Sequence, residues 1–117
     1  MSYRIVLAAS FRGCIKRLEK RFRHVKDDVH TAIVQLLQNP AQGVLIPRDF
    51  GVRKLRVRNT DLPKGKSGGY RLLYYVEMQP VPTIYLLLLY AKSDRDDVTL
   101  RELRQLIDEM MNESAAR

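Results

Sequence analysis

The sequence predicts an α+β fold in which helices pack against a small antiparallel sheet of about four strands. Three consecutive segments, residues 53–59, 70–78 and 83–91, have the side-chain types and alternation that are typical of strands. The segments before and after them repeat apolar residues at helical spacing instead. At 117 residues the chain is long enough to bury a substantial core without disulfides or a metal. We therefore expect one domain over residues 1–117.

The N-terminal part predicts a short strand and then a basic helix. Residues 2–7 favour the strand, and Ser10 is suited to cap the helix that follows it. Residues 11–24 repeat apolar side chains at helical spacing, and cations occupy the other faces. This basic segment has two interpretations, a contact to nucleic acid or an ordinary solvated helix face, and the sequence does not separate them.

A second helical segment is predicted over residues 27–38. Asp27 and Asp28 lie in its first turn, where the helix dipole stabilises negative charge, and Asn39 and Pro40 end it. The two segments form either two adjacent antiparallel helices or one kinked helix, which lies against the sheet.

Positive charge concentrates on the first strand of the sheet and in the loop after it. The chain carries 21 Lys and Arg against 13 Asp and Glu, a net charge of +8, and its pI is about 9.9. Along the strand, Lys54, Arg56 and Arg58 share one face, whereas Leu55 and Val57 share the other. Residues 53–71 contain a single acidic residue, Asp61, and seven cations: Arg53, Lys54, Arg56, Arg58, Lys64, Lys66 and Arg71. Such a patch indicates a phosphate backbone or a strongly acidic protein as partner, and the alternative is a basic surface with no polyanion partner.

The remaining segments complete the sheet and add a C-terminal helix. Residues 41–50 are predicted as a loop, and a break at residues 79–82 makes the last two strands a hairpin. The apolar run 84–89 does not alternate, which is typical of a central strand covered on both faces. Thr99 and Glu102 form a capping box for a helix over residues 100–112. We expect residues 113–117 to fray.

Several classes of protein and site are disfavoured. The chain has one cysteine, Cys14, so it forms no intrachain disulfide, and it shows no signal peptide or membrane-spanning segment, which favours the cytoplasm. His24 and His30 project from different sides of a helix, so they do not suggest a metal site. The aspartates at positions 94, 96 and 97 precede a helix start, where negative charge is stabilised, and we do not expect them to bind a metal.

The segments KLRVRN, GKSGGYRLLYY and IYLLLLYAKSDRDDVT resemble bacterial toxins of the RelE/ParE superfamily, nearest to its HigB-like and RelE-like branch. The resemblance covers about residues 11–106. It implies the order strand, two helices, three strands, helix, with the two N-terminal helices on one face of a twisted sheet and an active cleft on the concave side. It also implies a toxin of a type II toxin–antitoxin system that inhibits translation as a ribosome-dependent mRNA endoribonuclease. The implied partners are an antitoxin protein, the ribosome and mRNA, with no membrane, metal or small-molecule cofactor.

The resemblance also implies roles for individual residues. Cleavage of RNA through its own 2′-hydroxyl needs a base, cations to stabilise the phosphate and an acid for the leaving oxygen. Lys64 and Lys66 match the family's catalytic basic residues, and Arg71 matches its phosphate-binding arginine. Lys92 lies near the position where relatives place a further acid or cation. A lysine acts as a base only when its pKa falls, which neighbouring cations favour. Further candidate nucleic-acid contacts are Lys54, Arg56, Arg58 and Tyr90.

Other interpretations of these residues and of the fold remain open. Lys64 and Lys66 could instead belong to a solvated loop. Arg71 could form a cross-strand ion pair with Glu77 or a neighbour, and Tyr90 could be a packing residue. The same fold also suits a ParE-like, non-enzymatic inhibitor of DNA gyrase or an inactive nucleic-acid-binding module.

Overall fold

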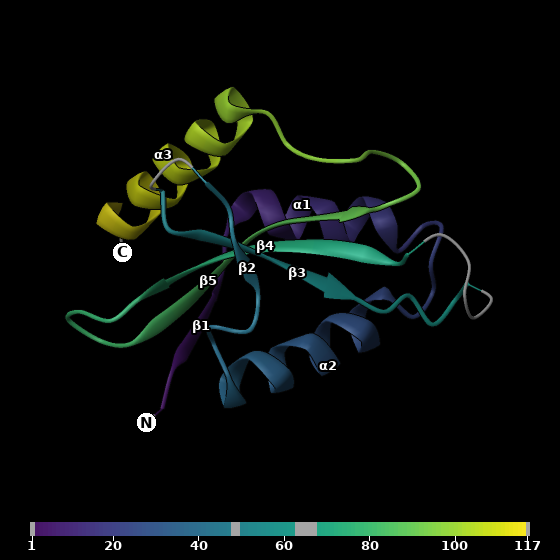
Figure 1. Cartoon of the computed structure of the whole chain (residues 1–117), viewed down its shortest axis with the longest axis horizontal. Coiled ribbons are helices and arrows are strands. Elements are labelled where there is room, and N and C mark those ends of the chain that lie inside the picture. Colours follow the sequence, from purple (N-terminus) through teal and green to yellow (C-terminus); the bar gives the residue numbers. More distant parts are fainter. Residues whose placement is uncertain (1, 48–49, 63–67, 117) are drawn as a thin grey trace.

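A computed structural model of the chain describes residues 2–47, 50–62 and 68–116. Within these residues the chain forms one five-stranded sheet, in the order β1-β5-β4-β3-β2, and three helices (Figure 1). In chain order the elements are β1 (Arg4–Leu7), α1 (Ala9–Leu18), α2 (Val25–Gln38), β2 (Val44–Leu45), β3 (Val52–Val57), β4 (Tyr70–Glu77), β5 (Thr83–Ala91) and α3 (Leu100–Ala116).

The predicted α+β fold and the order of its main elements are confirmed, and two details of the sheet differ. The edge strand β1 runs parallel to β5, whereas the other neighbouring strands pair antiparallel. The loop expected over residues 41–50 contains a fifth strand, β2, which pairs with β3. A strand of two residues is too short to produce an alternation in the sequence, so the pattern could not reveal it.

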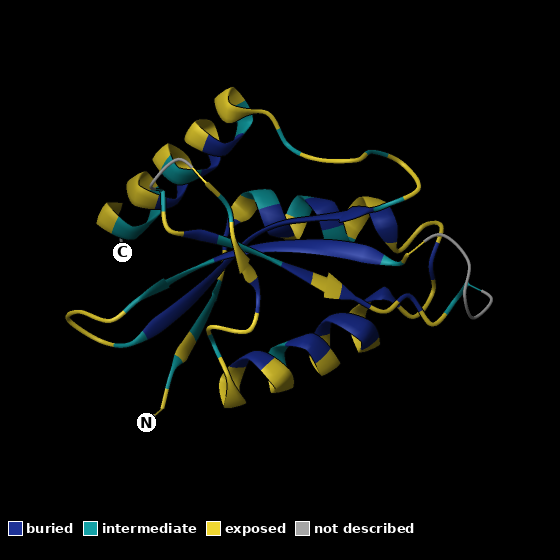
Figure 2. Cartoon of the chain, viewed as in Figure 1, coloured by how far each residue is buried: buried dark blue, intermediate teal, exposed yellow. Residues whose placement is uncertain are grey.

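Helices cover both faces of the sheet. On one face, Phe22 packs edge-on against Tyr70, with 5.8 Å between the ring centroids, and this is the face of α1 and α2. On the other face, the Tyr85 hydroxyl lies 3.4 Å from the Ser114 hydroxyl of α3. Every residue of β5 is buried between these layers (Figure 2). The unbroken apolar run 84–89 follows from this double cover.

The first helix differs from its prediction at both ends. The helix α1 already begins at Ala9, so Ser10 is not its cap; the Ser10 hydroxyl instead donates to the Leu87 carbonyl at 2.7 Å. The helix ends at Leu18 rather than near residue 24, because the chain tightens into a turn there, in which the Arg21 N–H donates to the Leu18 carbonyl at 3.0 Å. Phe22 nevertheless stays buried, which is why the apolar pattern continues past the end of the helix. The two segments are therefore separate helices that run in opposite directions (Figure 1).

The C-terminal helix is longer than predicted. One half of the predicted capping box is present, since Thr99 Oγ1 accepts the Glu102 N–H at 3.1 Å, whereas the Glu102 carboxylate accepts hydrogen bonds from Arg95. However, α3 continues through Ala116, so the expected fraying from residue 113 is wrong for residues up to that point. The reason is a tertiary contact, because the Glu113 side chain accepts the Ala9 N–H at 3.1 Å and holds the last turns of α3 against the start of α1. No helix in the described part of the chain has the length and apolar character needed to cross a bilayer.

Candidate nucleic-acid interface

The register of the three central strands collects side chains that lie far apart in the sequence. Arg56 pairs with Arg71, and Arg71 in turn pairs with Tyr90, so these three side chains form a row on the α3 side of the sheet. Lys54 precedes Arg56 by two residues and therefore shares that face, and Lys92 follows the end of β5. We call this set of five residues the basic face.

Arg71 is a nearly buried cation that has no acidic partner among the described residues. It is 9% exposed, and its Nη1 donates to the Gly68 carbonyl at 2.6 Å and to the Tyr70 carbonyl at 3.2 Å. No ion pair of Arg71 is found among the described residues, and Glu77 lies instead near the Tyr85 hydroxyl. Burial, and then the neighbouring charge of Arg56, lower the pKa of Arg71. A guanidinium remains protonated at neutral pH despite such a shift, so a cation in this position favours an anionic ligand.

Two glycines set the backbone that leads into Arg71. Gly68 and Gly69 have φ values of +73° and +66°, which side-chain-bearing residues rarely adopt. A Cβ on Gly69 would lie 2.4 Å from the Val57 carbonyl oxygen, so the close approach of β3 also requires glycine there. A Cβ on Gly68 would lie 3.6 Å from both Arg71 Nη2 and Lys92 Cγ. The glycine turn thus brings Arg71 and Lys92 to the same place at the end of the sheet.

The segment 93–98, which we call the acidic strap, lies over the basic face. Lys92 Nζ is 2.9 Å from Asp96 Oδ1, and Lys54 Nζ is 3.1 Å from Asp97 Oδ1. The Arg95 guanidinium sits 5.1 Å from the centroid of the Tyr90 ring. Tyr90 is only 5% exposed, and burial is the main cause that raises the pKa of its hydroxyl. Tyr90 is therefore not an open stacking surface while the strap is in place.

Other predicted site residues lie elsewhere. Lys64 and Lys66 fall outside the described residues, so their predicted roles stay predictions. Arg58 lines a groove beside α2, together with Asp28 and Thr31, and it does not join the row formed by Arg56. The sequence pattern did not show that Gly68 lies between the side chains of Arg71 and Lys92. It also explained the aspartates of the strap only by the helix that starts after them. The repeated glycine before Tyr70 and Arg71 was the signal that could have indicated the close approach.

The described residues contain no group of three or more His, Cys, Asp or Glu that could hold a metal ion. His24 is engaged elsewhere, because its ring Nδ1 lies 2.6 Å from Asp61 Oδ1. The backbone N–H of His24 also donates to Asp61 and is the main cause that lowers the pKa of this carboxyl.

No protein-family model matches the sequence. Among solved structures, the chain is similar to a doubly substituted variant of the Escherichia coli toxin RelE in the free state, with a TM-score of 0.55 and 18% sequence identity. The match covers 82% of this chain and 90% of the RelE chain. The chain therefore has the RelE-like fold that its sequence motifs imply.

Proposed function

We propose that this protein is the toxin of a type II toxin–antitoxin system and that it cleaves mRNA on the ribosome in the cytoplasm. The observation that carries the proposal is the basic face on a RelE-like fold. At its centre lies Arg71, which is nearly buried and forms no ion pair within the described part of the chain. A cation held in a partly desolvated site interacts more strongly with a developing phosphate charge than one in water does.

The proposed chemistry is metal-independent attack by the 2′-oxygen on the adjacent phosphorus. The bond from phosphorus to the 5′-oxygen breaks, which leaves a 2′,3′-cyclic phosphate and a free 5′-hydroxyl. Arg71 and Arg56 suit the binding of the nonbridging oxygens, since both are fixed in register on neighbouring strands. We assign the role of base to Lys66 or Lys64 and the role of acid to Lys92, whose side chain passes near Arg71 at the glycine turn.

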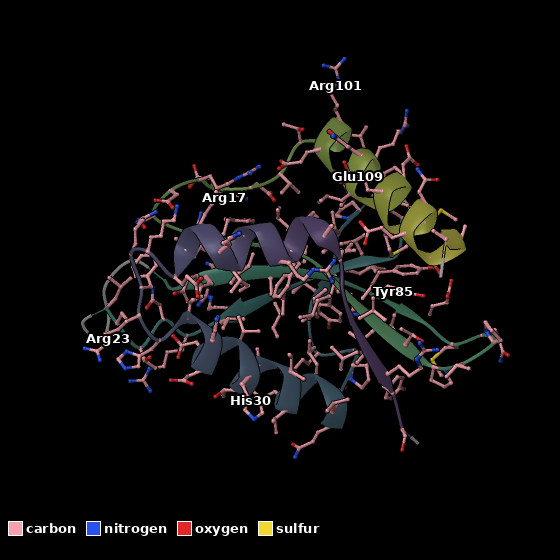
Figure 3. All side chains as sticks on the ribbon, turned by 180° about the vertical axis from the view of Figure 1, so that it is seen from behind. Arg17, Arg23, His30, Tyr85, Arg101 and Glu109 are labelled. Atoms are coloured by element: carbon pink, nitrogen blue, oxygen red, sulfur yellow. The ribbon has the colours of Figure 1, made fainter. Side chains whose placement is uncertain are left out.

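Expression of variants, followed by primer extension on a reporter transcript, tests this function. We expect the wild type to cut the transcript only when it is translated and Arg71→Ala to abolish cutting. Lys66→Ala is expected to abolish it as well. Arg101→Ala is the matched control because Arg101 lies on α3 and points away from the sheet (Figure 3). Cutting by Arg71→Ala at the wild-type level, with the fold intact, would contradict the proposal.

A second candidate is ParE-like inhibition of DNA gyrase without catalysis. One observation favours it, namely that the strap buries Tyr90 and covers part of the basic face. A non-enzymatic inhibitor needs no open catalytic face. Inhibition of gyrase supercoiling by the purified protein, with no transcript cleavage during translation in vitro, would establish this candidate and exclude the first.

Either function implies an antitoxin partner. The net charge of +8 suits an acidic segment that lies across the basic surface of the toxin. Coexpression of an adjacent open reading frame that restores growth would identify such a partner.

A further inference from the structure

The acidic strap is attached to three separate parts of the protein through its carboxylates. Besides the contacts of Asp96 with Lys92 and Asp97 with Lys54, Asp94 makes a two-pronged contact to Arg21, at 2.6 and 3.1 Å. Figure 1 shows the strap arching from the end of β5 to the start of α3. A chain that needed only to connect these two elements would not require an ion pair at each of these aspartates.

Arg95 fixes the strap over Tyr90. Its guanidinium stacks on the Tyr90 ring and forms a two-pronged ion pair with Glu102 of α3. The Tyr90 hydroxyl in turn lies 3.5 Å from the Asp96 carbonyl. The strap therefore covers the aromatic side chain of the basic face and neutralises two of its cations at the same time.

We propose that Asp96 and Asp97 occupy phosphate positions of the basic face, and that an RNA backbone binds by displacing the strap. Displacement frees Lys54 and Lys92 for two phosphates and uncovers Tyr90 for a base. This inference rests on the proposed function only in taking RNA as the polyanion. It adds an internal competitor that holds the site in a weakly binding state.

The contacts of the strap are of the kind that a polyanion can replace. The side chains of Asp96 and Asp97 are 96% and 62% exposed, and ion pairs at such sites are weak and screened by salt. The hydrogen bond from Lys92 lowers the pKa of Asp96, and the Val98 N–H, followed by Lys54, lowers that of Asp97. Both carboxylates are therefore charged at neutral pH. Several linked phosphates bind the same cations with the additional gain of counterion release.

Fluorescence anisotropy with a labelled 2′-O-methyl RNA oligonucleotide, which cannot be cleaved through its 2′-oxygen, tests the inference. The variant Asp96→Asn/Asp97→Asn removes the competitor, and the amide oxygen that it places at position 97 can still accept the Val98 N–H. The control Asp108→Asn/Glu109→Gln removes the same charge from an exposed part of α3. At low ionic strength we expect the strap variant to bind about three- to tenfold more tightly than the control, from the loss of two exposed ion pairs.

A single substitution away from the cations gives an independent test. Glu102→Gln weakens the anchor of Arg95 but touches neither Lys54 nor Lys92, and Asp108→Asn on the same helix is its charge-matched control. We expect Glu102→Gln to bind the oligonucleotide about twofold or more tightly than Asp108→Asn. Circular dichroism melting confirms that each variant is folded.

Equal affinities of the strap variants and their controls, or no binding of the oligonucleotide by any of them, would overturn the inference. The proposed function is judged separately, by transcript cleavage. If the wild type cleaves the transcript but the strap variants and their controls bind RNA equally, only the strap inference is contradicted. Tighter binding by the strap variants without any transcript cleavage would support the strap inference and exclude the proposed endonuclease function.

Discussion

Arg71 carries a structural cost, and we propose that it has a functional use. Its side chain is nearly buried, bonds only to carbonyls among the described residues, and lies opposite a second arginine, Arg56. A buried cation without an anion lowers stability, and this cost to the fold is the reason for our proposal that Arg71 binds an anionic ligand.

Replacement of Arg71 by Met separates these two roles. Met fills a similar volume, removes the desolvated charge and loses two hydrogen bonds, so we expect the free energy of unfolding to change by less than about 1 kcal/mol. Transcript cleavage should be lost. Urea denaturation and primer extension measure the two effects. A loss of stability above about 3 kcal/mol would instead mark Arg71 as a structural residue.

Gly69 is the residue whose substitution should cost the most local strain. Its φ is +66°, and a Cβ would lie 2.4 Å from the Val57 carbonyl oxygen, which belongs to a neighbouring strand and cannot move freely. We expect Gly69→Ala to lower the free energy of unfolding by about 2 kcal/mol or more. Gly13→Ala, within α1, is the control and should stabilise by about 0.5 to 1 kcal/mol. Equal effects of the two substitutions in urea denaturation would refute the argument.

At the scale of elements, a buried carboxylate links α2 to the chain that follows β3. Asp28 is 6% exposed and accepts hydrogen bonds from the Thr60 N–H at 3.0 Å and the Thr60 hydroxyl at 2.9 Å. Asp28→Ala removes the acceptor of both hydrogen bonds. Because Thr60 is itself exposed and its donors can turn to water, we expect a cost of about 1 to 2 kcal/mol in thermal or urea unfolding. Asp27→Ala, the exposed neighbour in the same helical turn, should cost less than about 1 kcal/mol. Similar losses for both variants would mean that the link to Thr60 is unimportant.

The strap should respond to acid through Asp94. The hydrogen bond from Arg21 lowers the pKa of Asp94 in the folded state. A depressed pKa means that the stabilisation is present above the unfolded value of about 4 and is lost as pH falls through the folded value. Because the pair is largely exposed, we expect Asp94→Asn to cost less than about 1 kcal/mol at pH 7. Urea denaturation measures the difference in free energy of unfolding between Asp94→Asn and the wild type. We expect this difference to disappear at acidic pH, and a difference that stays constant down to the lowest pH would contradict the argument.

These elements also show what the sequence could and could not predict. The predicted bounds of β5 are correct to the residue, because an apolar run between a proline break and a charged residue leaves little choice. The predicted end of α1 was wrong because Phe22 lies in the turn after the helix, yet its apolar side chain is buried at the spacing that a continuing helix would have. The row formed by Arg56, Arg71 and Tyr90 depends on strand register, and the contacts of the strap depend on tertiary distance. Neither is encoded in a local pattern.

At the scale of the whole molecule, the charge of the protein is divided between a basic sheet face and an acidic segment that covers part of it. The net charge of +8 draws polyanions to the surface, while the strap reduces the number of cations that are free to bind them. Both effects are electrostatic, but they act over different distances and in opposite directions. Salt therefore distinguishes them.

We predict that the advantage in RNA affinity of Asp96→Asn/Asp97→Asn over Asp108→Asn/Glu109→Gln shrinks as salt rises. Salt weakens RNA binding by both variants, but it also weakens the ion pairs by which the strap competes in the control, so the two lines of log affinity against log salt converge. Anisotropy titrations at increasing sodium chloride concentrations measure the slopes. Lines that coincide at every salt concentration would mean that the two aspartates act only through net charge, because the two variants carry the same net charge. In that case Lys54 and Lys92 would be as free to bind RNA in the wild type as in the variant, and the strap would be an ordinary connection between β5 and α3.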